Sequence, residues 1–387
     1  MKKTGYLAFA LLMLALGISD ALRGVLAPLF QTHFALSTAQ LSMVVTVSYL
    51  GNLVFLLLGG RVLDKLPRKA ALMLFIAIWM AALGLFTVTD SYLCLLIGMF
   101  FAMGASTLLS TAVSLTTRLL VAGSPAAMVN ILFFVQGIGT SGSQSLVGNL
   151  TGDFAGWKQI NLLLLLCGAG VLLLLAFQGI SMEPPCLPTE KPAEKPAEKP
   201  WHNRAFWPLV CVFGFYFIAE HGVMNWLVSY ASTALNQSRG AAANYTAVLF
   251  GGLMVGRLLF SPLIDRVGIY KSLRIFGTGA CILYSAGILL GGSGLWLLAA
   301  SGVLFSILYP TLLLVVPMLW PVRFSAGACG TIVAVASLFD ILFNFAFGAV
   351  VDRIGFRLGF LLMPLSMLFF LASLLTLTRK GAQPGGG

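Results

Sequence analysis

Residues 60–69 read Gly-Arg-Val-Leu-Asp-Lys-Leu-Pro-Arg-Lys, and residues 261–271 read Ser-Pro-Leu-Ile-Asp-Arg-Val-Gly-Ile-Tyr-Lys. Both stretches are charged segments between long apolar runs, and their acids lie 201 positions apart. Two further pairs of acids repeat at offsets of 199 and 200 positions: Asp153 with Asp352, and Asp20 with Glu220. This recurrence predicts a duplicated unit, with an acid at the same place in the first helix of each copy.

The composition predicts an all-α membrane protein. The 387 residues are 59% hydrophobic and 9% charged, with a mean hydropathy of +0.97. Apolar runs near 20 residues are long enough to cross a bilayer as helices. The first run has no small-residue cleavage site and carries charged residues, so we expect it to be retained as a span. Twelve spans in two pseudo-symmetric six-helix bundles are expected, at 5–31, 38–60, 70–89, 92–117, 125–149, 158–180, 205–232, 241–264, 272–291, 295–320, 324–350 and 357–378.

The polar segments between and after these runs predict the domain boundaries. Residues 1–180 form the first bundle and residues 204–380 the second. Between them, residues 181–203 contain Glu-Lys-Pro-Ala repeats, whose proline content predicts an extended cytoplasmic linker. The tail 381–387 is Gly-rich and could include a cloning remnant.

The net charge of +11 does not indicate nucleic acid, because the basic residues are unevenly placed. With both termini in the cytoplasm, 17 Lys and Arg residues face that side, four face the other, and two lie within spans. This positive-inside bias predicts a multi-pass protein of the cytoplasmic (inner) membrane with both termini cytoplasmic. We expect a monomer whose partners are the lipid bilayer and a small solute. The six cysteines are scattered without metal-ligand spacing, so neither a metal nor another cofactor is expected.

The charged segment at residues 60–69, its echo at 261–271 and the six-plus-six pattern resemble the major facilitator superfamily. That family carries Gly-x-x-x-Asp-[Arg/Lys]-x-Gly-[Arg/Lys]-[Arg/Lys] between its second and third helices. Gly60, Asp64, Lys65, Arg68 and Lys69 match it, whereas Pro67 replaces the second glycine. The resemblance implies a transporter whose first, fourth, seventh and tenth helices line a central cavity.

Shorter motifs resemble one branch of that superfamily. Asp20, Gly24 and Pro28 are spaced four residues apart and are followed by Phe34, Leu36 and Gln40. This pattern is similar to the opening of the fucose:proton-symporter-like branch. Glu220 followed by Trp226 and Tyr230 is similar to sugar-transporting members of that branch. The resemblance therefore implies a sugar-like solute.

Asp20 and Glu220 are the first candidates for proton coupling. A carboxylate in a span costs about 2.5–3.5 kcal/mol on insertion scales, so one that persists faces a partner or a water-filled cavity. Burial away from water favours the neutral form of a carboxyl group, which proton coupling requires. Arg23 follows Asp20 by three residues on the same helical face. It either neutralises Asp20 as an ion pair, which would favour Glu220 as the proton carrier, or binds an anionic group of the solute.

Several polar and aromatic residues accompany these acids as candidate solute ligands. His221 and Asn225 share a helical stripe beside Glu220, and Trp226 and Tyr230 form the flanking stripe. Polar groups around an aromatic face suit a polyhydroxylated solute. Asp340 and Asn344, four residues apart, mark the eleventh span. Asp340 is a third proton-coupling candidate or a partner of Arg257, and further solute ligands could be Gln136 and Tyr49.

The charged loop residues have a different expected task. Asp64 with Arg68, and Asp265 with Arg266, lie at cytoplasmic helix ends. Charge-assisted contacts there would hold the cytoplasmic side closed and break when it opens. We therefore expect these four residues to act as a cytoplasmic gate and not as solute ligands.

The function expected is secondary active transport of a small polar, sugar-like solute by alternating access, with proton symport. The sequence contains no Gly-x-x-x-x-Gly-Lys-[Ser/Thr] loop, the motif that would indicate ATP use. Two alternatives use Asp20, Arg23, Glu220 and His221 for a divalent metal or for an organic anion. An intramembrane enzyme is a remote alternative, because no nucleophile–base or metal signature accompanies the acids.

Overall fold

The computed structural model describes residues 3–120, 125–177, 200–320 and 322–381, and no β-strand occurs among them. The chain divides into two compact helical units, Met1–Glu190 and Lys191–Gly387. Each unit is described by itself below. Most of the expected linker, residues 178–199, lies outside the described residues, as does the tail from residue 382.

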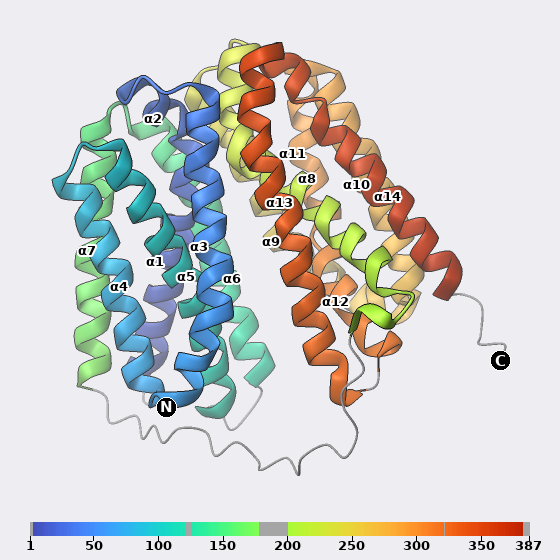
Figure 1. Cartoon of the computed structure of the whole chain (residues 1–387), viewed down its shortest axis with the longest axis horizontal. Helices are drawn as coiled ribbons and strands as arrows, with labels where there is room; N and C mark the ends of the chain where they lie inside the picture. The colour runs from blue at the N-terminus through green and yellow to red at the C-terminus, as the bar shows by residue number, and fades with distance from the viewer. Residues whose placement is uncertain (1–2, 121–124, 178–199, 321, 382–387) are drawn as a thin grey trace. The chain divides into compact units, whose positions relative to one another are not determined.

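In its described residues, the first unit has seven α-helices that correspond to six expected spans (Figure 1). They are α1 (Lys3–Val25), α2 (Ala27–His33), α3 (Thr38–Lys65), α4 (Arg68–Val88), α5 (Tyr92–Leu120), α6 (Pro125–Leu150) and α7 (Phe154–Ala176). The first expected span is divided between α1 and α2 at Leu26. Pro28 lies two residues later, and its missing N–H group interrupts the helical hydrogen-bond series there.

The second unit also corresponds to six expected spans. Its α-helices are α8 (Phe206–Ala234), α9 (Arg239–Val267), α10 (Ile269–Leu289), α11 (Leu295–Phe305), α12 (Leu308–Leu319), α13 (Val322–Gly359) and α14 (Leu362–Gly381), with short 3₁₀ turns η1 (Pro200–His202) and η2 (Gly291–Gly294). The tenth expected span is broken between α11 and α12. Pro310 lies four residues after Ser306 and has no N–H to donate to the Ser306 carbonyl, which is therefore left free.

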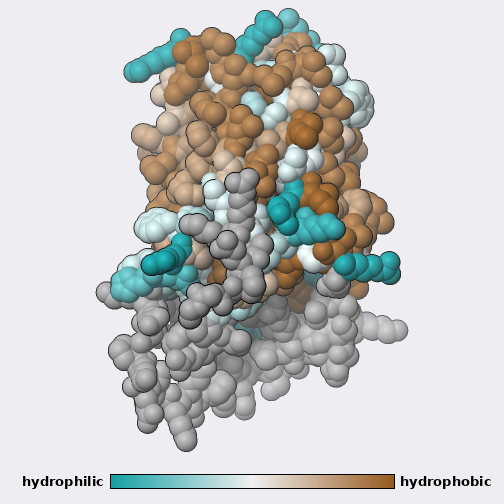
Figure 2. Space-filling view, turned by 90° about the vertical axis from the view of Figure 1, so that its right-hand side faces the viewer, coloured by the Kyte–Doolittle hydropathy of each residue, from teal (hydrophilic) through white to brown (hydrophobic). Residues whose placement is uncertain are grey.

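The helices have membrane-spanning length and composition. Within the described residues, ten helices are long and apolar enough to cross a bilayer, and Leu362–Thr378 is a shorter apolar helix. Helix α6 is not among the ten, and it carries Gln136, Gln144 and Asn149. Large apolar side chains point outward, and hydrophobic residues cover most of the described surface seen in Figure 2. The expected all-α membrane fold is confirmed.

Glycines allow close helix approach beside the polar residues. In the first unit, a side chain at Gly17 of α1 would collide with the backbone of Gln136 on α6, and one at Gly139 with the backbone of Leu14. In the second unit, a side chain at Gly302 of α11 would collide with the backbone of Leu249 on α9. Small residues at such positions are the usual means of packing membrane helices. The packing places Asp20 next to the α1–α6 contact and Arg257 next to the α9–α11 contact.

Candidate functional site

In the first unit, Asp20 lies on α1 and contacts α5. The Ser106 hydroxyl donates a hydrogen bond of 3.0 Å to Asp20 Oδ2. The other carboxyl oxygen, Oδ1, is buried and has no hydrogen-bond partner in the described part of the chain. A buried oxygen without a partner is costly, so this position suits a proton, a water or a solute hydroxyl.

Arg23, one turn further along α1, lies over an aromatic ring. Its guanidinium carbon is 4.5 Å from the ring centroid of Tyr49 on α3, and both residues are largely buried. This is a cation–π contact in a span. The Arg23 charge also acts on Asp20 electrostatically. Arg23 thus has partners within its own unit. These contacts weaken the organic-anion alternative, which needs Arg23 to bind the solute.

Helix α5 provides a row of hydroxyl groups that the sequence analysis did not single out. Besides the Ser106–Asp20 bond, the Thr107 hydroxyl donates to Asn52 Oδ1 of α3 at 2.9 Å. The Gln136 amide of α6 donates to the Ser110 hydroxyl at 3.3 Å. One helix therefore contacts polar groups of three others. The available signal was the Ser-Thr pair at 106–107 followed by Ser-Thr at 110–111, four residues later in an apolar span.

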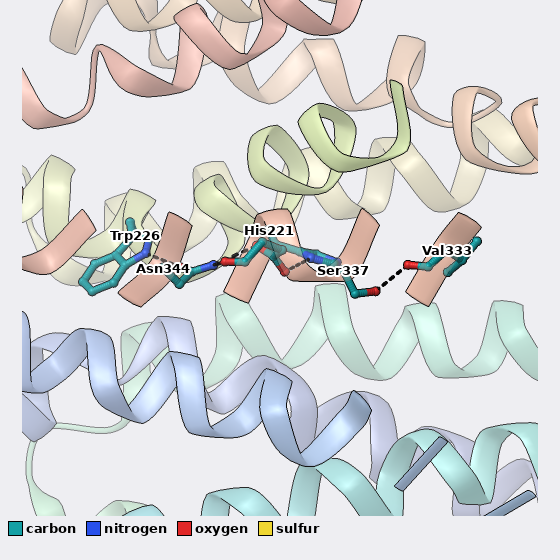
Figure 3. A network of polar contacts seen from close by, with 6 residues as sticks. His221, Trp226, Val333, Ser337 and Asn344 are labelled. Carbon is teal, nitrogen blue, oxygen red and sulfur yellow. Dashed lines mark hydrogen bonds and ion pairs between the residues drawn. The ribbon is translucent and has the colours of Figure 1, made fainter. Parts of the chain in front are cut away.

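In the second unit, α8 and α13 are joined by a continuous series of polar contacts (Figure 3). His221 Nδ1 lies 2.7 Å from Asp340 Oδ2, and the Asn344 amide donates to Asp340 Oδ1 at 2.7 Å. The Trp226 indole N–H donates to Asn344 Oδ1 at 2.9 Å. The Asp340 side chain is 3% exposed and that of His221 is 27% exposed. The series thus runs from an enclosed indole to an imidazole that is accessible from outside the unit.

The expected partner of Asp340 is different from the one observed. The structure pairs Asp340 with His221 of α8 instead of Arg257. Arg257 of α9 donates from Nε to the Ser306 carbonyl at 3.2 Å. Pro310 leaves that carbonyl without its helical hydrogen bond. Arg257 donates a replacement bond at the break between α11 and α12. The sequence pattern could not show this, because the acceptor is a backbone atom exposed only by the broken helix.

Glu220 lies beside His221 on α8 and near two tyrosines. It acts electrostatically on Tyr216 of the same helix and on Tyr309 of α12, as does Arg257. The two tyrosine rings stack, with centroids 6.1 Å apart. The buried Tyr216 hydroxyl lies close to the Glu220 carboxylate. An acid, a cation and two phenol groups therefore surround one position in the second unit.

In this conformation, the remaining predicted ligands are too buried to contact a solute. Asn225 and Trp226 are fully buried, and Tyr230 stacks on Phe360 with ring centroids 4.0 Å apart. His221 remains accessible and stacks on Phe217, with centroids 5.6 Å apart. The ligand roles of Asn225, Trp226, Tyr230 and Asn344 stay predictions.

The expected gate is only partly visible. The side chains of Asp64 and Asp265 lie outside the described residues, although their backbones belong to α3 and α9. Arg68 begins α4, and its Nε and Nη1 atoms are buried without a hydrogen-bond partner in the described part of the chain. Arg266 is exposed in the last turn of α9. The gating role of these residues stays a prediction.

The divalent-metal alternative finds no support in the geometry. Within residues 3–120, 125–177, 200–320 and 322–381, no group of three or more His, Cys, Asp or Glu side chains could hold a metal ion. The polar clusters are instead built from single acids with hydroxyl, amide, imidazole or guanidinium neighbours. These groups suit proton exchange and hydrogen bonding to a neutral polar solute.

Comparison with known proteins gives the family and the fold. The model of the Major Facilitator Superfamily matches residues 7–331. A Helicobacter pylori (strain J99) protein named "Putative glucose/galactose transporter" is 29% identical over 180 residues. That match covers 45% of this chain and 42% of the relative, so the chain aligns with less than half of the relative's length.

Solved transporters share the architecture at low sequence identity. A mutant of the nucleoside transporter NupG superposes with a TM-score of 0.80 at 13% identity, covering 96% of this chain and 99% of that one. The E. coli fucose:proton symporter FucP gives a TM-score of 0.64 at 18% identity, covering 98% of each chain. Likeness at these identities shows the fold alone. The chain belongs to the Major Facilitator Superfamily, a family of transporters, and is a multi-pass membrane protein.

Proposed function

We propose that this transporter moves a sugar-like solute together with a proton, by alternating access of its two helical units. The observation that carries the proposal is the His221–Asp340 pair, which lies within spans beside a second acid, Glu220. Ionisable groups inside membrane spans are rare, and they mark ion and substrate pathways. Proton coupling requires such groups to change charge during the transport cycle.

The His221–Asp340 pair can hold a proton in a defined place. The two side chains are 2.7 Å apart, and Asn344 fixes the second Asp340 oxygen. Imidazole exchanges protons near neutral pH, so the pair can lose or gain one proton without leaving its position. Asp20, with one bonded and one unbonded carboxyl oxygen, is the proton-binding candidate of the first unit.

The solute is proposed from the chemistry around these acids and from the relatives. His221 stacked on Phe217, and the stacked Tyr216 and Tyr309, combine apolar ring faces with polar groups. Sugars are bound through such combinations, because ring faces cover C–H surface while polar groups bind hydroxyls. The names of the Helicobacter pylori relative and of FucP support a sugar, and FucP's name also supports a proton as the coupling ion.

Placement in the membrane follows from the basic residues. We infer that the chain lies in the cytoplasmic membrane as a monomer, with both termini in the cytoplasm. Cysteine-accessibility labelling of residues at both ends of the chain in intact cells tests the orientation. Labelling from outside by a membrane-impermeant reagent would contradict it.

The solute class is tested first by ligand-dependent thermal stabilisation of the purified protein. Glucose, galactose, fucose, uridine, a dicarboxylate and Mn²⁺ are compared at pH 6 and pH 8. A ligand that binds the folded state raises Tm by mass action. We expect a hexose to give the largest increase. Stabilisation by uridine, the dicarboxylate or Mn²⁺, with none by a hexose, would contradict the sugar proposal.

Coupling is then tested by uptake of that solute into proteoliposomes with and without an imposed pH gradient. The wild type should accumulate solute only with the gradient. Glu220→Gln should lose accumulation and retain exchange of labelled for unlabelled solute. The matched control is Asp90→Asn, which removes a largely exposed acid paired with Lys158. Gradient-driven accumulation by Glu220→Gln at the wild-type level would refute proton coupling through Glu220.

A further inference from the structure

Helix α10 has one face that packs within its unit and one that does not. The packed face contains Leu273, Phe276, Ala280 and Tyr284, and α10 contacts α11 and α14, beside which it lies in Figure 1. The opposite face carries Lys271 and Arg274 in its first turns, followed by a stripe of exposed apolar residues: Ile275, Ile282 and Leu289. This face is therefore basic at one end and apolar along its length.

A hollow lies where the basic end meets the apolar stripe. It has a volume of about 510 Å³ and is lined by Lys271, Arg274, Ile275, Thr278 and Gly279. Gly279 contributes no side chain, and a Cβ atom there would lie 3.0 Å from a methyl group of Leu304. The glycine therefore lets α10 pack closely against Leu304 of the neighbouring helix α11, next to the two cations.

The two cations of the hollow are not neutralised within the described part of the protein. No ion pair within 4.0 Å joins Lys271 or Arg274 to an acid there. Helix α10 itself contains no Asp or Glu. It also begins at Ile269, so its positive N-terminal end lies within a turn of Lys271. The local field at the hollow attracts an anion.

We propose that this hollow binds the phosphate headgroup of an anionic phospholipid, whose acyl chains lie along the apolar stripe of α10. Lys and Arg side chains bind phosphate oxygens through charge-assisted hydrogen bonds. Basic hollows on the cytoplasmic side of membrane proteins are suited to anionic headgroups, and the sequence predicts this end of α10 on that side. The proposal concerns a lipid site and is independent of the transported solute.

The dimensions of the stripe agree with a lipid. From Arg274 to Ile282 the helix rises roughly 12 Å, at about 1.5 Å per residue. One leaflet contributes about half of a hydrocarbon core roughly 30 Å thick. An acyl chain that starts from a headgroup at Lys271 and Arg274 therefore runs past Ile275 and Ile282 within its own leaflet. Free phosphate could neutralise the cations but would leave the exposed apolar residues uncovered.

The test is native mass spectrometry of the full chain with defined lipids: phosphatidylglycerol, cardiolipin and phosphatidylcholine. The wild type should retain one anionic lipid more tightly than phosphatidylcholine. The double variant Lys271→Gln/Arg274→Gln should bind that anionic lipid about 25-fold more weakly, at roughly fivefold for each basic residue near the membrane surface. Lys271→Arg/Arg274→Lys keeps both charges and should bind as the wild type does.

The matched control is Arg353→Gln/Arg357→Gln, which removes two exposed cations from α13 of the same unit. It should retain the lipid, and circular dichroism of every variant should show the wild-type helical content. Equal binding by the Lys271/Arg274 variant and the wild type would overturn the proposal. So would an equal loss in the α13 control, or displacement of the lipid by inorganic phosphate at equimolar concentration.

Discussion

The two units repeat an acid at the same place in their first helices, Asp20 and Glu220, but surround it with different chemistry. Asp20 accepts a hydrogen bond from Ser106 of α5, an uninterrupted helix. At the same 200-residue offset that separates Asp20 from Glu220, Ser106 corresponds to Ser306, and Ser110 corresponds to Pro310. The proline breaks the second copy, and the freed Ser306 carbonyl accepts a hydrogen bond from Arg257.

This difference lies in the contacts that each unit makes around its polar residues. In the first unit, side-chain hydroxyl groups of the intact helix α5 form hydrogen bonds with Asp20, Asn52 and Gln136. In the second unit, a broken helix provides a backbone acceptor for the cation Arg257, whereas in the first unit the cation Arg23 lies over the Tyr49 ring. The two units therefore hold a cation near their acid in different ways, on an aromatic ring in the first and on a freed backbone carbonyl in the second.

The largest expected effect comes from the buried acid of the second unit. Asp340→Ala removes the acceptor of both His221 and Asn344. Hydrogen bonds to a charged group contribute about 1.5–3 kcal/mol each, so we expect a loss of about 3 kcal/mol in unfolding free energy. Denaturant unfolding in detergent measures it. Thr140→Ala, at the 200-residue offset in the first unit, should lose no more than about 1 kcal/mol, and equal losses would remove the contrast between the units.

A smaller effect is expected at the acid of the first unit. Ser106→Ala leaves Asp20 without its hydroxyl donor and should destabilise the protein by about 1.5–2 kcal/mol. Ser106→Thr keeps a hydroxyl group and is the matched control. Thermal unfolding of the three proteins in the same detergent measures the difference. If alanine and threonine behave alike, the hydroxyl does not hold Asp20.

Arg257 tests the role of the broken helix. Arg257→Gln removes the guanidinium from the Ser306 carbonyl and from the neighbourhood of Glu220, so we expect about 1 kcal/mol of destabilisation and slower solute exchange. Ser306→Ala removes the serine hydroxyl, which donates to the Val303 carbonyl, and leaves the backbone acceptor in place. Its exchange rate should match that of the wild type. Slower exchange in Ser306→Ala than in Arg257→Gln would show that the side chain, and not the carbonyl, matters.

The smallest expected effect concerns the cation–π contact of the first unit. Tyr49→Leu removes the ring beneath Arg23 and should cost about 0.5–1 kcal/mol of stability. Tyr49→Phe keeps the ring and should lose less. Thermal unfolding of both variants decides the matter, and a larger loss in Tyr49→Phe would assign the stabilisation to the tyrosine hydroxyl.

Much of the fold follows from the sequence, because apolar runs of bilayer length and the repeated loop acids are local patterns. Each expected span has its helical counterpart. The deviations occur before Pro28 and Pro310, where a proline removes a hydrogen bond, and at Gly355, whose positive φ kinks α13. The sequence marks several polar residues within apolar spans, and the roles predicted for them stay predictions. Their partners were not predictable, because helix rotation and close packing at glycines decide which polar faces meet.

Two cases show this limit of sequence reasoning. Two readings of Asp340 were open, a proton-coupling role or a pair with Arg257, and in the structure His221 of α8 contacts its carboxylate. Arg257 binds a backbone carbonyl that a sequence pattern does not display. In contrast, the pairing of Asn344 with Asp340 follows the four-residue helical spacing and could be anticipated from the sequence.

The central claim is that solute and proton move together through the acids of the second unit. The most direct measurement is the external pH of a lightly buffered proteoliposome suspension when the solute identified by thermal stabilisation is added without an imposed gradient. The account predicts that the medium becomes alkaline as protons enter with solute in the wild type, and that Asp340→Asn abolishes the change. Solute entry into wild-type vesicles with no change in external pH would contradict it.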